Sequence, residues 1–305
     1  GATNAELKEA SDELIKYGVQ PWTFMERYGL TMPDFIDHVD LMSVSPGAPT
    51  MPSLKLLGGR LHSQRIQELP FDISRWIDDD DRKVMGGYLG NDLDTTIDLA
   101  TDLMAQIDLR TEMSKQYGVD LRSKSDAQIA EAVIKSQIER NRGGRKLYPP
   151  DIRPGSFKYE VPEFIRFKTP RMQQLLRDIR ELKFAVDSSG TVKMPEYFSS
   201  LDLMIGNSKY TMGIGGLHSN EANISHYSDD DFVLLDRDVT SFYPSIILRC
   251  RLFPKHIGES FLTIYESIFK RRLAAKAAGE KTTAETLKIV LNGSFGKLGS
   301  PYSAL

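Results

Sequence analysis

Two aspartates, Asp236 and Asp238, follow a run of four apolar residues in the second half of the chain. The run, Phe232 to Leu235, predicts a strand buried on both faces, and α/β proteins often have a site at the polar end of such a strand. Carboxylates there are suited to binding a divalent metal ion. The alternative is that the aspartates merely terminate the strand. The residues that follow favour Asp238 as a metal ligand.

Residues 238–244 read D-V-T-S-F-Y-P and resemble motif A of family B DNA polymerases, usually written D-x-x-S-L-Y-P. The one departure is Phe242, which replaces leucine and keeps the position apolar. The resemblance implies that residues 231–258 are the first segment of a polymerase palm. It also implies that Asp238 binds two catalytic Mg²⁺ ions, with Mn²⁺ as an alternative, and that the carbonyl of Val239 contacts a metal. Tyr243 would pack under the sugar and exclude a 2′-hydroxyl.

A second motif lies near the C-terminal end of the sequence. Residues 288–296 read K-I-V-L-N-G-S-F-G and resemble the family's motif B, K-x-x-x-N-S-x-Y-G. Gly293 replaces the serine, and Phe295 replaces the tyrosine, so the ring is kept and its hydroxyl is lost. Apolar periodicity over 259–278, a stop at Gly279 and a new start at Thr283 predict two antiparallel helices. By resemblance, residues 259–305 are the polymerase fingers.

Cations recur at helical spacing on both of these expected helices. Arg272 and Lys276 are four residues apart, as are Lys288 and Asn292, so each pair shares one helical face. Charge-assisted donors in this arrangement suit a triphosphate, although any single lysine is more often a solubility residue. The resemblance implies that the three cations hold the dNTP phosphates and that Lys288 protonates pyrophosphate. The residues implied to line the nascent base pair are Asn292, Phe295 and Gly296.

Tyr88 and Asp92 lie four residues apart on a predicted helix and therefore share a face. Upstream of a polymerase motif, this pair resembles the third motif of the family's 3′–5′ exonuclease, in which the aspartate binds metal and the tyrosine orients water. The D-x-E and N-x-x-x-D motifs expected ahead of it are not found. Residues 1–112 are thus expected to be the C-terminal part of a ribonuclease H-like exonuclease domain of the phage and prophage type. The acidic run at 78–81 is expected to begin a helix rather than to bind metal.

Residues 113–230 are expected to form a linker that contacts DNA. Base is concentrated at 135–146 and 166–183, where a solvated helix face and phosphate contact are both open interpretations. Gly215 and Gly216 occupy the place of the family's Y-x-G-G segment, in which Gly213 replaces the tyrosine. The two glycines would let the backbone approach the primer-template, or would simply turn a hairpin. Alternating residues at 39–44 predict a strand, and residues 192–197 and 201–205 predict a small sheet.

Composition is that of a soluble, globular protein of mixed α/β class. The 305 residues are 40% hydrophobic and 27% charged, with a net charge of −3, so a DNA-binding surface must be local. The single cysteine, Cys250, fits a reducing compartment. No apolar run reaches membrane-spanning length and no signal peptide is visible. We expect a cytoplasmic protein, in the host cell if a phage encodes it.

The resemblance implies template-directed DNA synthesis from dNTPs, with proofreading, by a DNA-directed DNA polymerase. Such catalysis requires a second carboxylate, which the family supplies from a later motif C of D-T-D type, and none follows Gly296. We expect an inactive fragment completed by a C-terminal segment or a second chain. The alternative is a non-catalytic DNA-binding or assembly module. A nuclease alone is the weakest interpretation, because its motif set is incomplete.

Overall fold

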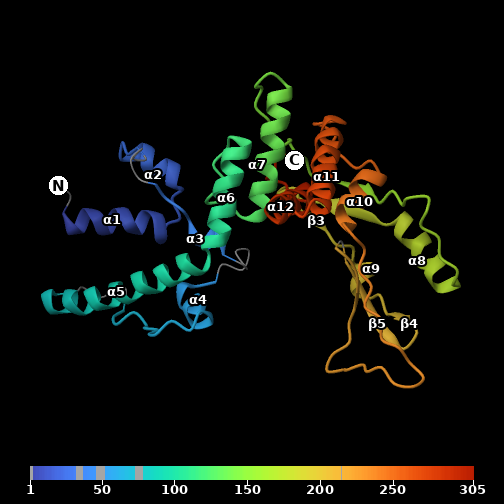
Figure 1. Cartoon of the computed structure of the whole chain (residues 1–305), viewed down its shortest axis with the longest axis horizontal. Helices are drawn as coiled ribbons and strands as arrows, with labels where there is room; N and C mark the ends of the chain where they lie inside the picture. Colours follow the sequence, from blue (N-terminus) through green and yellow to red (C-terminus); the bar gives the residue numbers. More distant parts are fainter. Residues whose placement is uncertain (1–2, 32–36, 46–51, 73–77, 214) are drawn as a thin grey trace. The chain divides into compact units, whose positions relative to one another are not determined.

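The structure is a computed structural model, and it describes residues 3–31, 37–45, 52–72, 78–213 and 215–305 (Figure 1). The chain divides into two units, Gly1–Val39 and Asp40–Leu305. The first unit holds α1 (Asn4–Ile15) and α2 (Pro21–Arg27). Thr3 caps α1 by accepting a hydrogen bond from the Glu6 amide, and the Glu6 carboxylate accepts one from the Thr3 amide. This reciprocal cap fixes the start of the first helix.

The second unit begins with three helices, α3 (Leu41–Val44), α4 (Leu54–Arg60) and α5 (Asp79–Asp102). The predicted strand at 39–44 is wrong, because the Asp40 carboxylate accepts a hydrogen bond from the Met42 amide and starts a helical turn there. The predicted acidic helix start is confirmed. Asp78 caps α5 and three aspartates occupy its first turn, where the helix dipole favours negative charge.

Five helices share one continuous apolar core, and we call them the helical core. They are α6 (Met104–Tyr117), α7 (Asp126–Asn141), α10 (Phe242–Arg249), α11 (Ser260–Ala277) and α12 (Lys281–Leu298). Each contributes side chains with almost no solvent exposure, for example Met113, Ile134, Ile247, Phe261 and Leu287. Helix α12 packs along both α7 and α11. The predicted antiparallel pair is confirmed: Gly279, with a φ of +76°, ends α11, and α12 starts two residues before Thr283.

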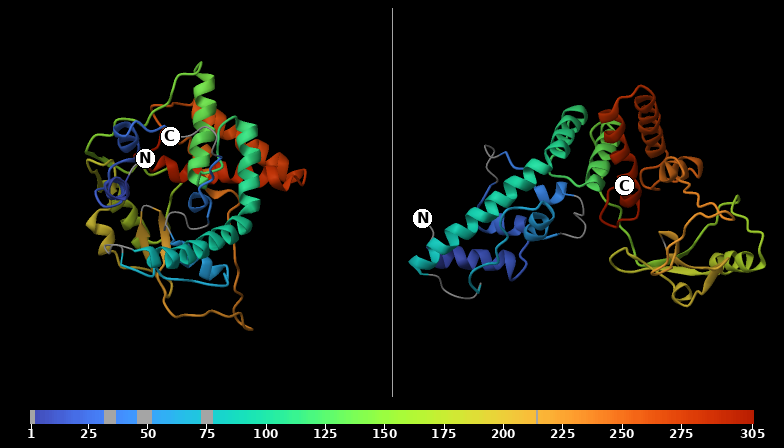
Figure 2. Two further views of the ribbon diagram at one scale, coloured as in Figure 1. Left: turned by 90° about the vertical axis from the view of Figure 1, so that its left-hand side faces the viewer. Right: turned by 60° about the horizontal axis from the view of Figure 1, so that its bottom comes forward.

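Two three-stranded antiparallel sheets lie between α7 and α10 in the sequence. This part of the chain is coloured yellow to orange in Figure 2. The first has the order β1 (Gly155–Lys158), β2 (Lys183–Val186), β3 (Val192–Lys193), with α8 (Pro170–Glu181) between its first two strands in sequence. The second is the meander β4 (Leu203–Ile205), β5 (Ser208–Gly213), β6 (Gly216–Ser219), which follows the short helix α9 (Glu196–Ser199). The small sheet predicted from 192–197 and 201–205 is therefore divided between the two sheets, and Glu196 and Tyr197 lie in α9 instead of a strand.

The predicted palm strand at Phe232–Leu235 is wrong. Its four side chains are 72%, 75%, 64% and 63% exposed, and the residues form no strand. A buried strand needs neighbouring strands to accept and donate its backbone hydrogen bonds. Here the Phe232 amide donates to the Asp229 carboxylate, and the Leu234 amide donates to the Ser228 hydroxyl. The backbone amides of this run therefore bond to side chains within a few residues, not to a neighbouring strand.

The described residues thus form a mixed fold of helices and small antiparallel sheets, as the fold class predicted in its coarse form. Strands occur only after residue 154 in the described part of the chain, and residues up to 112 contribute helices. The assignment of the exonuclease, linker, palm and fingers domains stays a prediction. Within the described ranges, every helix is too short or too polar to cross a bilayer.

Candidate functional site

The motif A residues lie where an irregular segment enters α10. Asp238 and Val239 are exposed and precede the helix instead of ending a buried strand. Ser241 is the residue before the first turn of α10, and its φ of +53° and ψ of +47° put it in the left-handed region. A residue other than glycine or asparagine rarely adopts this conformation. In it, the Ser241 side chain makes no capping hydrogen bond to α10.

Arg272 on α11 reaches the motif A segment. Its Nη1 donates a hydrogen bond of 2.9 Å to the Ser241 hydroxyl. The Nε of the same guanidinium is buried and has no hydrogen-bond partner in the structure. A buried donor without a partner costs free energy. Because the Nε is buried, the donors that an incoming acceptor could reach on this side chain are those of the Nη groups.

A second contact joins motif A to motif B. The rings of Tyr243 on α10 and Phe295 on α12 stack with centroids 4.2 Å apart and planes inclined by 26°. Both rings remain 40% exposed, so each keeps a face or edge toward solvent. The resemblance of motifs A and B predicts that both residues face the incoming nucleotide. The two side chains are in direct contact, although 52 positions separate 243 from 295.

The structure explains why glycine stands at position 293, where the family's motif B has serine. A Cβ at this position would lie 2.5 Å from the Asp126 carbonyl oxygen and 2.8 Å from the Ala130 Cβ. Helix α12 therefore packs against the backbone of α7 at a distance that only glycine allows. The adjacent Ser294 and Leu291 are fully buried, which fixes the rotation of α12 about its axis.

That rotation leaves the predicted nucleotide-contacting residues of α12 outside the core. Lys288, Asn292 and Gly296 are all exposed, and Lys288 forms a 3.1 Å ion pair with Glu285 one turn earlier. Lys276 on α11 is exposed as well. The structure thus presents these side chains to solvent, as a substrate-binding role requires, but exposure is equally what a solubility role requires.

The predicted Mg²⁺ ligands are oxygen atoms, as Mg²⁺ requires, but they are too few to hold two ions. The Asp238 carboxylate and the Val239 carbonyl offer hard oxygen ligands of the type that Mg²⁺ takes. A two-metal site needs further carboxylates, and among the described residues no group of three or more His, Cys, Asp or Glu side chains is gathered to hold an ion. Metal binding by Asp238 stays a prediction that requires an additional ligand source.

Tyr88 and Asp92 do share one face of α5, as predicted. The Tyr88 phenol lies in a polar group with the Asp92 carboxylate, and the pKa of Tyr88 is raised first by desolvation and then by its hydrogen bond to Asp92. Lys55 of α4 lies 5.9 Å above the Tyr88 ring and forms a 2.5 Å ion pair with Glu68. The hydrogen bond with Glu68 is the main cause that raises the pKa of Lys55, and the Asp92 carboxylate makes a smaller contribution in the same direction.

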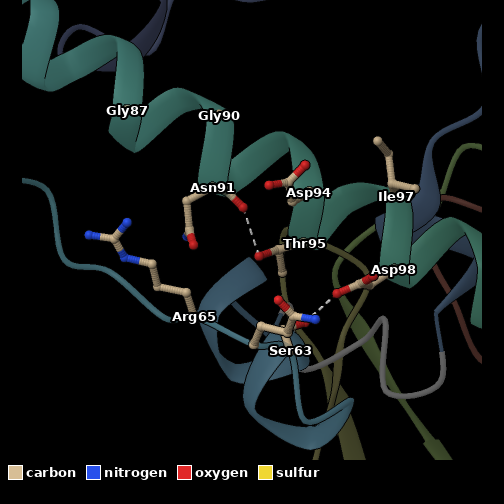
Figure 3. Close-up of a pocket in the computed structure, with 10 residues that line it drawn as sticks. Ser63, Arg65, Gly87, Gly90, Asn91, Asp94, Thr95, Ile97 and Asp98 are labelled. Carbon is tan, nitrogen blue, oxygen red and sulfur yellow. Dashed lines mark hydrogen bonds between the residues drawn. The ribbon is translucent and has the colours of Figure 1, made fainter.

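Figure 3 shows a polar pocket of the α4–α5 region, and neither Tyr88 nor Asp92 is among the residues that line it. Its volume is about 520 Å³, and Asn91, Asp94 and Asp98 line it from α5. The Ser63 hydroxyl donates to the Asp98 carboxylate at 2.9 Å, and the Thr95 hydroxyl donates to the Asn91 carbonyl at 2.9 Å. The two predicted exonuclease residues and this pocket are therefore separate features.

Gly213 ends β5, Gly216 begins β6, and Gly215 lies directly before β6. Gly213 and Gly216 are register partners in that pair, and the φ of Gly216 is +139°, which a residue with a side chain rarely adopts. Ile214 of this segment lies outside the described residues. The hairpin interpretation is confirmed, and contact of Gly215 and Gly216 with DNA stays a prediction.

Two features escaped sequence reasoning. The Ser241–Arg272 contact spans 31 residues, and the serine belongs to motif A without any signal for its partner. Lys55 and Glu68 lie in unrelated segments and gave no pattern. No family model, no curated protein and no solved structure matches this chain. The likeness to family B DNA polymerases therefore rests on the quoted motifs and on the contacts between them.

Proposed function

We propose that this chain carries the nucleotide-binding part of a family B-type DNA polymerase that extends a primer on a DNA template. One observation carries the proposal: the stack of Tyr243 from motif A on Phe295 from motif B. Two sequence motifs that resemble one family, in the family's order, are brought into contact at the side chains that would face one substrate. If either motif resembled the family only by chance, there would be no reason for Tyr243 and Phe295 to be in contact.

In the proposed site, each element has one task. Tyr243 and Phe295 form the wall against the sugar and base of the incoming dNTP, with Asn292 and Gly296 beside them on α12. Arg272, Lys276 and Lys288 hold the triphosphate by charge-assisted hydrogen bonds. Mg²⁺ held by Asp238, Val239 and a further carboxylate would supply the positive charge that nucleotidyl transfer needs. That carboxylate would come from a second chain or from another segment of the parent protein.

The test compares the binding of dATP and ATP to the chain in the presence of primed DNA and Mg²⁺. We expect the chain to prefer dATP, and we expect Tyr243→Ala to reduce that preference about tenfold, because the ring fills the space of a 2′-hydroxyl. Tyr227→Ala is the matched control, since it also removes a tyrosine ring, from an exposed position outside both motifs. Equal affinity for dATP and ATP in the unmodified chain would contradict the proposal.

A DNA-binding or assembly module remains the second candidate, supported by the basic helix α8. Arg177 and Arg180 are exposed on this helix, whose apolar side, through Leu175, faces the interior. The same experiment separates the two functions. Salt-sensitive binding of primed DNA, with no binding of any nucleotide, would favour the module. Primer extension that Asp238→Ala abolishes would favour the polymerase and would show that the second carboxylate lies within this chain.

A further inference from the structure

Ser241 has an unusual use in this structure. A serine directly before a helix normally accepts a hydrogen bond from an amide of the first turn, which stabilises the helix by about 1 kcal/mol. Ser241 makes no such cap, and its backbone adopts the left-handed conformation. Its hydroxyl instead accepts the hydrogen bond from Arg272 Nη1. The N-terminus of α10 therefore lacks a side-chain cap, and the backbone of Ser241 is strained. The contact that this conformation allows is the hydrogen bond with Arg272 on α11.

The hydrogen bond to Ser241 orients the Arg272 guanidinium but leaves another of its donors without a partner. A guanidinium has five N–H donors in a planar fork, and a hydrogen bond at one Nη fixes the plane in which the others point. The buried Nε of Arg272 lacks a partner. A serine hydroxyl carries no charge, so it orients the guanidinium without neutralising it. An aspartate at position 241 would neutralise it.

We propose that Ser241 is a positioning residue: through its hydroxyl it holds the Arg272 guanidinium in the orientation that receives the phosphates of an incoming nucleotide. The proposal rests on the proposed function, because it assigns phosphate binding to Arg272. The left-handed backbone of Ser241 is the means by which the hydroxyl points to α11 instead of capping α10. Without the hydroxyl, Arg272 regains its rotamer freedom and must lose it again on binding.

The experiment measures the affinity of a fluorescent dATP analogue for the chain with primed DNA and Mg²⁺. Ser241→Ala is expected to weaken binding about tenfold, in keeping with one hydrogen bond to a charged group. Ser241→Gly removes the hydroxyl and also relieves the backbone strain, so it should weaken binding equally while folding at least as stably. Ser241→Thr keeps a hydroxyl and should restore most of the affinity. Ser245→Ala, on the same helix, is the matched control.

A double-mutant cycle shows whether the effect passes through the arginine. Arg272→Ala should weaken binding more than Ser241→Ala does, and adding Ser241→Ala to Arg272→Ala should weaken it no further. If Ser241→Ala weakens binding equally with and without Arg272, or if it has no effect, the positioning role is wrong while the proposed function stands. If the unmodified chain binds no dATP analogue, the proposed function fails and the positioning role fails with it.

Discussion

Two regions of this protein carry residues that resemble a catalytic family, and they are built differently. In the helical core, α12 is seated against α7 by Gly293 and by residues with no solvent exposure, and its exposed face carries the motif B side chains. In the α4–α5 region, the described part of α5 buries only Thr95 and Leu99. The same kind of sequence evidence therefore leads to a rigidly supported group in one region and to a group on a solvated helix in the other.

The contacts of the key aromatic residues differ in the same way. Tyr243 stacks on the ring of another predicted site residue, Phe295, at 4.2 Å. Tyr88 contacts its own motif partner, Asp92, four residues along the same helix, and also meets the ammonium of Lys55, which the motif did not include. The two contacts differ in range: Tyr243 and Phe295 come from helices far apart in the sequence, whereas Tyr88 and Asp92 are neighbours on one helix and would meet in any helical structure.

The strongest test of this difference is the substitution Gly293→Ala. Its Cβ would meet the carbonyl oxygen of Asp126 at 2.5 Å, and backbone cannot move aside as a side chain can. We expect the free energy of unfolding to fall by about 3 kcal/mol, measured by chemical denaturation. Gly58→Ala is the matched change in the other region, where the Cβ would lie 2.8 Å from the Thr95 Cγ2 and in ordinary contact with the Ser63 side chain at 3.6 Å. It should cost about 1 kcal/mol, because the Thr95 side chain can move.

Gly296→Ala is the control within α12. No atom lies within 4 Å of a Cβ at Gly296, so the substitution should be neutral or should stabilise the helix by up to about 1 kcal/mol. If Gly293→Ala were as well tolerated as Gly296→Ala, α12 would not be seated on α7 as described. The contrast between the two regions would then lose its basis.

A second prediction concerns the buried hydrogen bond between Tyr265 on α11 and Leu291 on α12. Tyr265 is fully buried, and its hydroxyl donates a 2.9 Å hydrogen bond to the Leu291 carbonyl. Tyr265→Phe should lower the free energy of unfolding by about 1 kcal/mol at neutral pH. Burial raises the pKa of Tyr265 far above its usual value of 10.0. Below pH 10 the phenol is neutral in both states, whereas above it the unfolded chain loses the proton and the folded chain keeps it.

The stability of the unmodified protein should therefore decline above pH 10 more steeply than that of Tyr265→Phe. Comparing the two proteins cancels the contribution of the other tyrosines. Parallel pH profiles of the two denaturation curves would mean that Tyr265 is not buried against α12.

The outcome of sequence reasoning follows the range of the interactions involved. Helix starts set by a local cap, such as that at Asp78, and the stop at Gly279 were predictable because the signal lies within a few residues. The apolar run at 232–235 misled, because a strand depends on partners that the run itself does not specify. The pairings of Ser241 with Arg272 and of Lys55 with Tyr88 were out of reach, since each depends on how separate helices pack.

The smallest expected effect is in the α4–α5 region. Asp92→Asn should lower the pKa of Tyr88 toward its usual value, because the substitution removes the carboxylate that favours the protonated phenol, while the larger contribution from desolvation stays. NMR of tyrosines labelled at the ring Cζ can follow Tyr88, assigned with Tyr88→Phe. Folding stability should change by less than about 1 kcal/mol, since both side chains are only half-buried and asparagine keeps a hydrogen-bond acceptor for the phenol. The affinity for the dATP analogue should not change either. A loss of that affinity would show that the α4–α5 group and the helical core act on one substrate, and the distinction between the two regions would then be wrong.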